Sequence, residues 1–215
     1  MVYVPRANAS FAPVWLSLRW SSQSGDPAEL LTAASATGLP LELSRNAALW
    51  RTGLNDHAFV VFFGGREVET STSQEWAANM TEASIFQATC ALGHRIDLFV
   101  LEMEAPWSDR QVHGALSALE LARSDGMVRF FGLSSRHPEV LQDVWRRFDG
   151  FEFVFLPSGL WQAEAAELAK RRGVATVAVA DSLETEETRL SPICLASVRS
   201  AKDVDWAFRL AKAEG

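Results

Sequence analysis

The sequence predicts an α/β protein, a compact (β/α)8 TIM barrel that forms a single domain over residues 1–215. Apolar runs of strand length alternate with stretches of helical periodicity along the whole chain, and eight such units follow one another. The strand runs are almost continuously apolar, which is typical of parallel strands that are buried on both faces. Eight parallel units favour a closed barrel. An open, doubly wound sheet is the competing interpretation.

Each predicted strand is a short run of apolar residues. The eight runs are Val14–Arg19, Leu39–Leu43, His57–Phe63, Ile96–Leu101, Val128–Leu133, Phe151–Leu156, Val174–Ala180 and Ile193–Val198.

The helices between the strands are predicted from helical spacing and from residues typical of helix ends, such as an Asp26 N-cap before Pro27. They are Ala28–Thr37, Ser73–Gly93 counting its caps, Ser108–Ser124, Pro138–Phe148, Gln162–Arg172, a short acidic helix Glu184–Arg189, and Ala201–Ala213. The units after the second and seventh strands therefore have little helix. Apolar barrel surface exposed there would favour a homodimer.

Composition excludes several classes of protein. The formal net charge of −7 argues against nucleic acid as a partner, because neutralising phosphates needs a basic face. We find no apolar run long enough to span a membrane and no pattern of a signal peptide, so a soluble cytoplasmic protein is expected. The four histidines and two cysteines are scattered, so no metal site is predicted. A P-loop and a G-x-G-x-x-G motif after a strand are also missing.

Arginines gather where the predicted strands end. In this fold, ligand groups lie at the carboxyl ends of the strands, and five of the eight ends carry an arginine. These residues are Arg19, Arg45, Arg66, Arg136 and Arg199. Because guanidinium groups bind carboxylate and phosphate in a bidentate manner, the ring of arginines indicates a small anionic ligand. Alternatively, each arginine pairs with a neighbouring carboxylate and binds no ligand.

Glu102 ends the fourth predicted strand, and Glu104 follows it. A carboxylate at the rim of a barrel is a candidate general acid or base, or else the partner of a neighbouring arginine. His137 follows the fifth strand and precedes Pro138, so it is either a base or the cap of the next helix.

Four motifs in the second half of the chain resemble the aldo-keto reductase family. They are EASIFQATCALGHRIDLFVLE (82–102), ALSALELARSDGMVRFFGLSS (115–135), AELAKRRGVATVAVADSL (166–183) and SVRSAKDVDWAF (197–208). Their order and spacing match the family from about residue 80 to 210. The resemblance implies an eight-unit barrel, NADPH as cofactor and reduction of carbonyl groups.

The resemblance also implies a catalytic tetrad of Asp, Tyr, Lys and His, most of which this chain lacks. Glu42 is the one acidic residue near the position of the Asp, Gly64 or Gly65 stands at the lysine, and Glu102 stands at the histidine. The only tyrosine of the chain, Tyr3, precedes the first predicted strand. The chain is therefore identified as a short, divergent relative whose proton-transfer mechanism is disabled.

The elements that the resemblance assigns to NADPH are half present. Ser134 and Ser135 match the residues that hold the nicotinamide carboxamide, Ser182 falls at the pyrophosphate loop, and Arg199 falls at the adenosine 2′-phosphate.

Two hypotheses follow. In the first, the barrel binds a small anionic molecule or a partner protein and does not reduce carbonyls. In the second, the chain is an oxidoreductase, or an enzyme without a cofactor, that uses Glu102 as acid or base with help from Glu104 or His137. In that case Arg19, Arg45, Arg66 and Arg136 hold the substrate.

Overall fold

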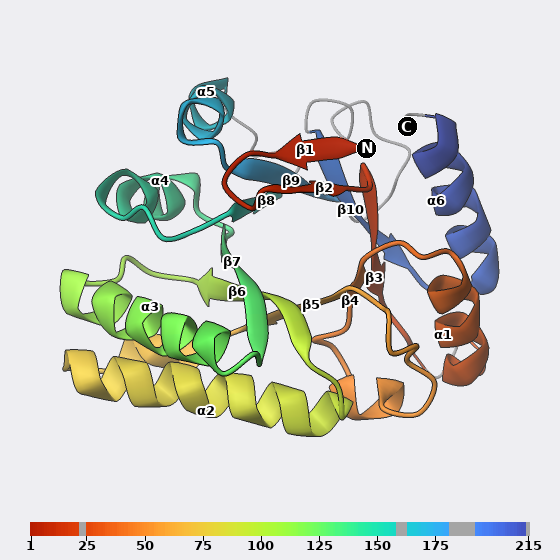
Figure 1. Ribbon diagram of the computed structural model, residues 1–215, viewed down its shortest axis with the longest axis horizontal. Helices are drawn as coiled ribbons and strands as arrows, with labels where there is room; N and C mark the ends of the chain where they lie inside the picture. The colour runs from red at the N-terminus through yellow and green to blue at the C-terminus, as the bar shows by residue number, and fades with distance from the viewer. Residues whose placement is uncertain (22–24, 158–162, 181–191, 214–215) are drawn as a thin grey trace.

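The computed structural model describes residues 1–21, 25–157, 163–180 and 192–213, and it shows the predicted closed barrel (Figure 1). Eight parallel strands pair in the order β10-β3-β4-β5-β6-β7-β8-β9. Their bounds are β3 (Val14–Leu18), β4 (Leu41–Glu42), β5 (Val60–Gly64), β6 (Ile96–Met103), β7 (Val128–Ser135), β8 (Phe153–Pro157), β9 (Ala175–Ala180) and β10 (Ile193–Val198). The open-sheet interpretation is therefore wrong, because β10 pairs with β3 and closes the ring.

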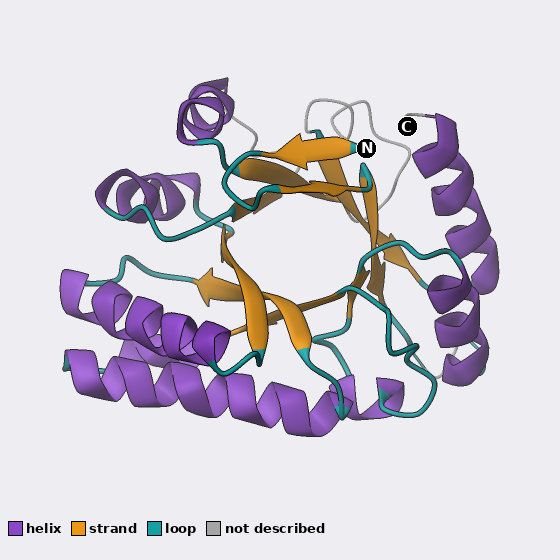
Figure 2. Ribbon diagram, viewed as in Figure 1, coloured by secondary structure: helices purple, strands orange, loops and turns teal. Residues whose placement is uncertain are grey.

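Helices surround the barrel, as Figure 2 shows. They are α1 (Pro27–Ala36), α2 (Gln74–Leu92), α3 (Asp109–Ser124), α4 (Pro138–Arg147), α5 (Ala163–Arg172) and α6 (Ala201–Ala213), with 3-10 helices η1 (Ala47–Trp50) and η2 (Arg66–Thr70). The unit after β4 has only η1, as predicted. The predicted helix Glu184–Arg189 lies outside the described residues. No helix in the described part of the chain is long and apolar enough to cross a membrane.

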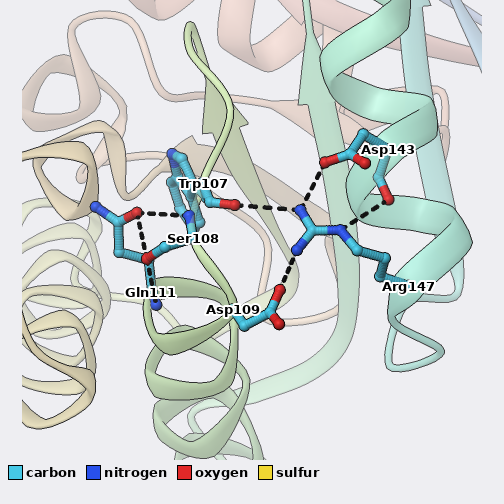
Figure 3. A network of polar contacts seen from close by, with 6 residues as sticks. All are labelled: Trp107, Ser108, Asp109, Gln111, Asp143 and Arg147. Carbon is cyan, nitrogen blue, oxygen red and sulfur yellow. Dashed lines mark hydrogen bonds and ion pairs between the residues drawn. The ribbon is translucent and has the colours of Figure 1, made fainter.

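Local sequence signals account for where the helices start. The Asp26 carboxylate accepts a hydrogen bond from the Ala28 backbone N–H at 2.8 Å, which caps α1. Ser108 and Gln111 form a reciprocal capping box at the start of α3. Arg147, at the end of α4, reaches across to the same point, where it contacts the Asp109 carboxylate and donates to the Trp107 carbonyl at 3.2 Å (Figure 3). These contacts fix the chain that leaves β6.

A hairpin that the sequence did not predict closes the amino-terminal end of the barrel. β1 (Val2–Val4) pairs with β2 (Ala9–Phe11). The Phe11 ring packs edge-on against the rings of Phe59, Phe130 and Phe153, which lie at or near the starts of their strands. Strands of three residues are too short to show a period, which is why the pattern missed them. Tyr3 belongs to this hairpin and is 58% exposed, so the only phenol lies at the end of the barrel opposite the ligand end.

Side chains that point into the barrel form their own apolar cluster. It includes Trp15 of β3, Leu98 and Val100 of β6, Phe155 of β8 and Leu195 of β10. The alternate residues pack outward under the helices, for example Phe99 and Leu101 of β6. This alternation has a consequence for the site, because it places Glu102 on the inward face of β6, at the carboxyl end.

An ion pair between the guanidinium of Arg6, in the turn of the hairpin, and the carboxylate of Asp149 links the hairpin to the segment that follows α4. The hydrogen bond from Arg6, and then the charges of Arg6 and Arg172, lower the pKa of Asp149. A carboxyl group with a lowered folded-state pKa stabilises the fold above its unfolded pKa of about 3.9, and this contribution is lost as the pH falls through the folded value. We expect Asp149→Asn to lower the free energy of unfolding by only about 0.5 kcal/mol at about pH 7, since solvent screens an exposed pair. In urea unfolding, the difference from the wild type should disappear near pH 2, and an equal difference at both pH values would contradict this.

Candidate active site at the carboxyl end of the barrel

An acidic and arginine cluster occupies the rim above β5 and β6. Arg66, which opens η2, donates from Nε to Glu102 Oε2 at 2.9 Å and from Nη2 to Glu102 Oε1 at 2.8 Å. Glu104 Oε1 lies 3.6 Å from Arg66 Nη2. The hydrogen bonds that Arg66 donates to Glu102, together with the charges of Glu102, Glu104 and Glu69, raise the pKa of Arg66. Both oxygens of Glu102 act as acceptors here, so Arg66 holds this side chain in a bidentate ion pair.

The rim around this pair is held by side chains that bond to the backbone. Glu69 Oε1 accepts from the backbone N–H of Glu104 at 2.5 Å and of Ala105 at 3.1 Å. The buried amide of Gln111 donates to the carbonyls of Val68, Glu69 and Ser71 at 3.0–3.1 Å. These bonds join η2 to the start of α3, and they therefore fix Arg66 and Glu102 relative to each other.

A second carboxylate, Glu42, lies at the mouth between β3 and β4 and is only 1% exposed. Glu42 Oε2 accepts from Ser17 Oγ at 2.5 Å and lies 3.2 Å from Arg19 Nη2, while Oε1 accepts from the Ser44 backbone N–H at 2.8 Å. Glu42 is not among the site residues that the sequence predicts, although it is the one acidic residue near the position of the family's Asp. Leu41 and Leu43 on either side of it are apolar and face outward. Because side chains alternate along a strand, this pattern indicates that Glu42 faces into the barrel.

Two arginines of the predicted ring lie on adjacent strands, although they are far apart in the sequence. Leu18 of β3 pairs with Val198 of β10, and the backbone N–H of Arg19 donates to the Val198 carbonyl at 2.9 Å. Arg19 and Arg199 therefore begin at the same level of the mouth. The side chain of Arg19 is 22% exposed and touches Glu42 through Nη2. Within the described ranges, its Nε and Nη1 and the whole guanidinium of Arg199 have no hydrogen-bond partner.

Arg45 and Arg136 are exposed, and no ion pair joins either of them to another described residue. Of the predicted arginines, the structure thus pairs Arg19 and Arg66 with a neighbouring glutamate, as the alternative interpretation of the ring expected.

His137 stands at the N-cap position of α4, but its side chain makes no capping bond. It is exposed, and its Nδ1 lies 3.7 Å from Glu139. Among the residues that the structure describes, no contact joins His137 to Glu102 or Glu104. The structure therefore does not bring the three predicted acid and base candidates into one contacting group.

The serines at the end of β7 point in opposite directions. Ser134 pairs in register with Glu102 and shares its inward face, whereas Ser135 is 3% exposed and lies on the outward face of Phe131 and Leu133. The Ser135 hydroxyl accepts a hydrogen bond from the His137 backbone N–H at 3.0 Å.

The set that the resemblance assigns to NADPH is therefore incomplete in the described chain. Ser135 is turned away from the mouth, Ser182 lies outside the described residues, and Ser134 and Arg199 remain accessible. In addition, Asp203 already caps the start of α6 by accepting from the backbone N–H groups of Arg199 and Ser200 at 2.9 and 3.0 Å. No three His, Cys, Asp or Glu side chains of the described segments are grouped so as to hold a metal ion.

The resemblance places the family's lysine at Gly64 or Gly65 and its tyrosine in the segment that holds Trp50. A Cβ atom on Gly64 would lie 2.8 Å from Ser84 Oγ and 2.9 Å from Phe99 Cζ. Gly65 has a φ of +82°, and a Cβ there would lie 2.8 Å from Leu101 Cδ2. Trp50, in the segment where the tyrosine would be, is buried and donates its indole N–H to the Arg45 carbonyl. The mouth offers guanidinium, carboxylate and hydroxyl groups, which suit the binding of a polar ligand.

No protein-family model matches the chain, and no curated protein sequence matches it. Solved structures of aldo-keto reductases do match it, with the same fold. The enzyme MGS-M4, from a Medee basin deep-sea metagenome library, has a TM-score of 0.75 at 14% identity over 96% of this chain and 87% of its own. An aldo/keto reductase from Brucella melitensis has a TM-score of 0.72 at 11% identity over 100% and 98%. The holo form of AKR11C1 from Bacillus halodurans has 0.68 at 14% identity over 92% and 85%.

The structure is therefore that of an aldo-keto reductase barrel, and the fold expected from the four motifs is confirmed. At these identities the likeness establishes the fold, and the function has to be argued from the mouth of the barrel.

Proposed function

We propose that this chain is an aldo-keto reductase barrel that binds a small anionic molecule at its carboxyl end and does not reduce carbonyls. The observation that carries the proposal is the adjacency of Arg19 and Arg199 at the ends of two paired strands, with nitrogen donors that bond to none of the residues the structure describes. Guanidinium groups with free N–H donors bind carboxylate and phosphate oxygens in a bidentate manner.

One neighbouring hydroxyl adds to this anion site. Ser197 lies on β10, two residues before Arg199, and pairs in register with Ser17, whose own hydroxyl donates to Glu42. Glu42 stands beside the guanidinium of Arg19, but both of its oxygens already accept hydrogen bonds. Recognition of the anion therefore depends on the geometry of the open N–H donors more than on an excess of positive charge.

The absence of reduction is inferred from three positions of the described chain. Tyr3 lies in the hairpin at the far end of the barrel. Gly64 or Gly65 stands where the resemblance places the lysine, and a Cβ atom at either position would come within 2.8 Å of a neighbouring side chain. Glu102 stands at the histidine with both oxygens bound to Arg66. Arginine does not supply a proton in the way that tyrosine does, because its pKa is too high.

The anion site is tested with inorganic phosphate as the probe. We expect phosphate to raise the melting temperature of the wild type, and we expect Arg199→Gln to weaken its binding at least tenfold, a loss of about 1.4 kcal/mol in binding free energy. Arg19→Lys keeps the charge beside Glu42 but loses the planar fork, so it should weaken binding as well. The matched control is Arg129→Gln, which removes an exposed guanidinium near the start of β7. The site would be ruled out if Arg129→Gln lost as much phosphate affinity as Arg199→Gln, or if phosphate did not change the melting temperature of the wild type.

A second candidate function is an enzyme that uses Glu102, with or without NADPH held through Ser134 and Arg199. The inward position of Glu102 at the mouth, 25% exposed and in register with Ser134, favours it. In this candidate Glu102 acts as the general base. NADPH-dependent turnover of any aldehyde in a broad panel, abolished by Glu102→Gln in a folded protein, would support this candidate against the first.

A further inference from the structure

A hollow of about 320 Å³ lies on the flank of the barrel between the end of β5 and α2, and it reaches the mouth at Glu102. This volume is at the lower end of the range for small-molecule pockets. The hollow is on the opposite side of Glu42 from the arginine pair of β3 and β10, as the strand order shows. It is therefore distinct from the proposed anion site.

One part of its lining is apolar. Phe62 of β5 stacks on Phe99, with ring centroids 6.2 Å apart, and lines the hollow. Ala88 and Ala91 of α2 line it from the other side, and their small side chains leave the space open. An apolar body of modest size would displace water from these surfaces.

The charged part of the described lining is acidic on balance. Arg66 is the one cation in it, and both of its engaged nitrogens are bound to Glu102. Glu67 also lines the hollow, is exposed, and forms no side-chain hydrogen bond or ion pair with another described residue. Glu104 and Glu69 act on Arg66 from nearby. The two carboxylates that line the hollow, with Glu69 and Glu104 nearby, outnumber the one guanidinium, so the hollow repels an anion and attracts a cation.

We propose that this hollow binds a small organic cation, an ammonium group carried on an apolar body. The ammonium lies at Glu67 and Glu102, and the apolar body packs between Phe62 and the two alanines. The side-chain amide of Gln87, which also lines the hollow and has no bond to another described residue, offers a further acceptor. This inference goes beyond the anion site, because it concerns another quadrant of the rim and a ligand of opposite charge.

The experiment is isothermal titration of the full chain with benzylamine, which is an ammonium ion at neutral pH. Ala91→Leu fills the hollow and should lower the affinity for benzylamine at least tenfold. Glu67→Gln removes a carboxylate that no described residue pairs, without changing the packing, and should lower the affinity for benzylamine at least threefold. Glu82→Gln is the matched control, since Glu82 is an exposed glutamate of α2 outside the lining, and it should leave binding unchanged.

Benzyl alcohol has the same apolar body without the charge, and we expect it to bind at least threefold more weakly than benzylamine to the wild type. The proposal is overturned if Ala91→Leu and Glu67→Gln both bind benzylamine as the wild type does, or if benzyl alcohol binds as tightly as benzylamine. Circular dichroism establishes that the variants are folded, and the exposed position of Glu67 makes its variant informative even if Ala91→Leu is unstable. Phosphate binding should be unchanged in both variants, so this site and the anion site can fail separately.

Discussion

Replacing Gly64 with lysine is expected to destabilise the barrel by about 2 kcal/mol and to leave it without carbonyl reductase activity. The resemblance places the family's lysine at Gly64 or Gly65, so this substitution is the direct attempt to restore it. The new Cβ would lie 2.8 Å from Ser84 Oγ and 2.9 Å from the Phe99 ring. Because Ser84 already accepts the Gly65 N–H at 3.2 Å, neither neighbour moves without breaking a contact. The measurement is the free energy of unfolding in urea, with NADPH oxidation in the presence of aldehydes as the second readout.

Arg66→Lys is the matched control, because it puts a lysine in the same segment without adding a Cβ. It exchanges the bidentate contact with Glu102 for a single one, and we expect a loss below about 1 kcal/mol at this partly exposed site. Gly65→Lys tests the alternative alignment and should also destabilise, since a φ of +82° costs a side chain about 1–2 kcal/mol. A Gly64→Lys variant as stable as the wild type, or one that oxidises NADPH with an aldehyde, would contradict the expectation.

Most of the fold could be predicted because its elements are long enough to show their period. Ile193–Val198 and Ala201–Ala213 agree with the prediction to the residue, and α2 and α3 agree within their caps. β4 shrinks from five predicted residues to two, because pairing with β3 and β5 covers only Leu41 and Glu42. The hairpin of residues 2–11 was missed, since its stability comes from Phe11 packing on rings far along the chain.

The site was predictable in its location and less so in its contacts. Strand ends identified the rim residues, including Glu102 and Arg66, which the structure joins. The partners of each arginine depend on which strands are adjacent and on which face each side chain lies. The pairing of Arg19 with Glu42, and its closeness to Arg199 across β10, follow only from the closed ring and its register. His137 was grouped with the glutamates because it also follows a strand, but it lies beyond the strand end, at the exposed start of α4.

Replacing Glu42 with alanine is expected to lower the free energy of unfolding by about 3 kcal/mol, the largest loss among the rim residues. Glu42 is 1% exposed and satisfies the Ser17 hydroxyl, the Ser44 backbone N–H and the Arg19 guanidinium. Its removal leaves these three donors without their acceptor at the base of the mouth. Ser44 also accepts the Phe63 N–H at 2.6 Å, so the disturbance extends to β5. Glu42→Gln keeps the shape and one acceptor oxygen, and it should cost less than the alanine variant.

A double-mutant cycle separates the ion pair from the other bonds of Glu42. Arg19→Met alone leaves a buried carboxylate without its cation and should be strongly destabilising, whereas Arg19→Met with Glu42→Leu removes both charges together. Replacing both partners of a buried pair with apolar groups is often neutral, so the double variant should be more stable than the sum of the single losses predicts. It should also lose phosphate binding, because Arg19 is gone while the fold is kept. Additive losses, or a Glu42→Ala variant within about 0.5 kcal/mol of the wild type, would show that the mouth is not held together by this carboxylate.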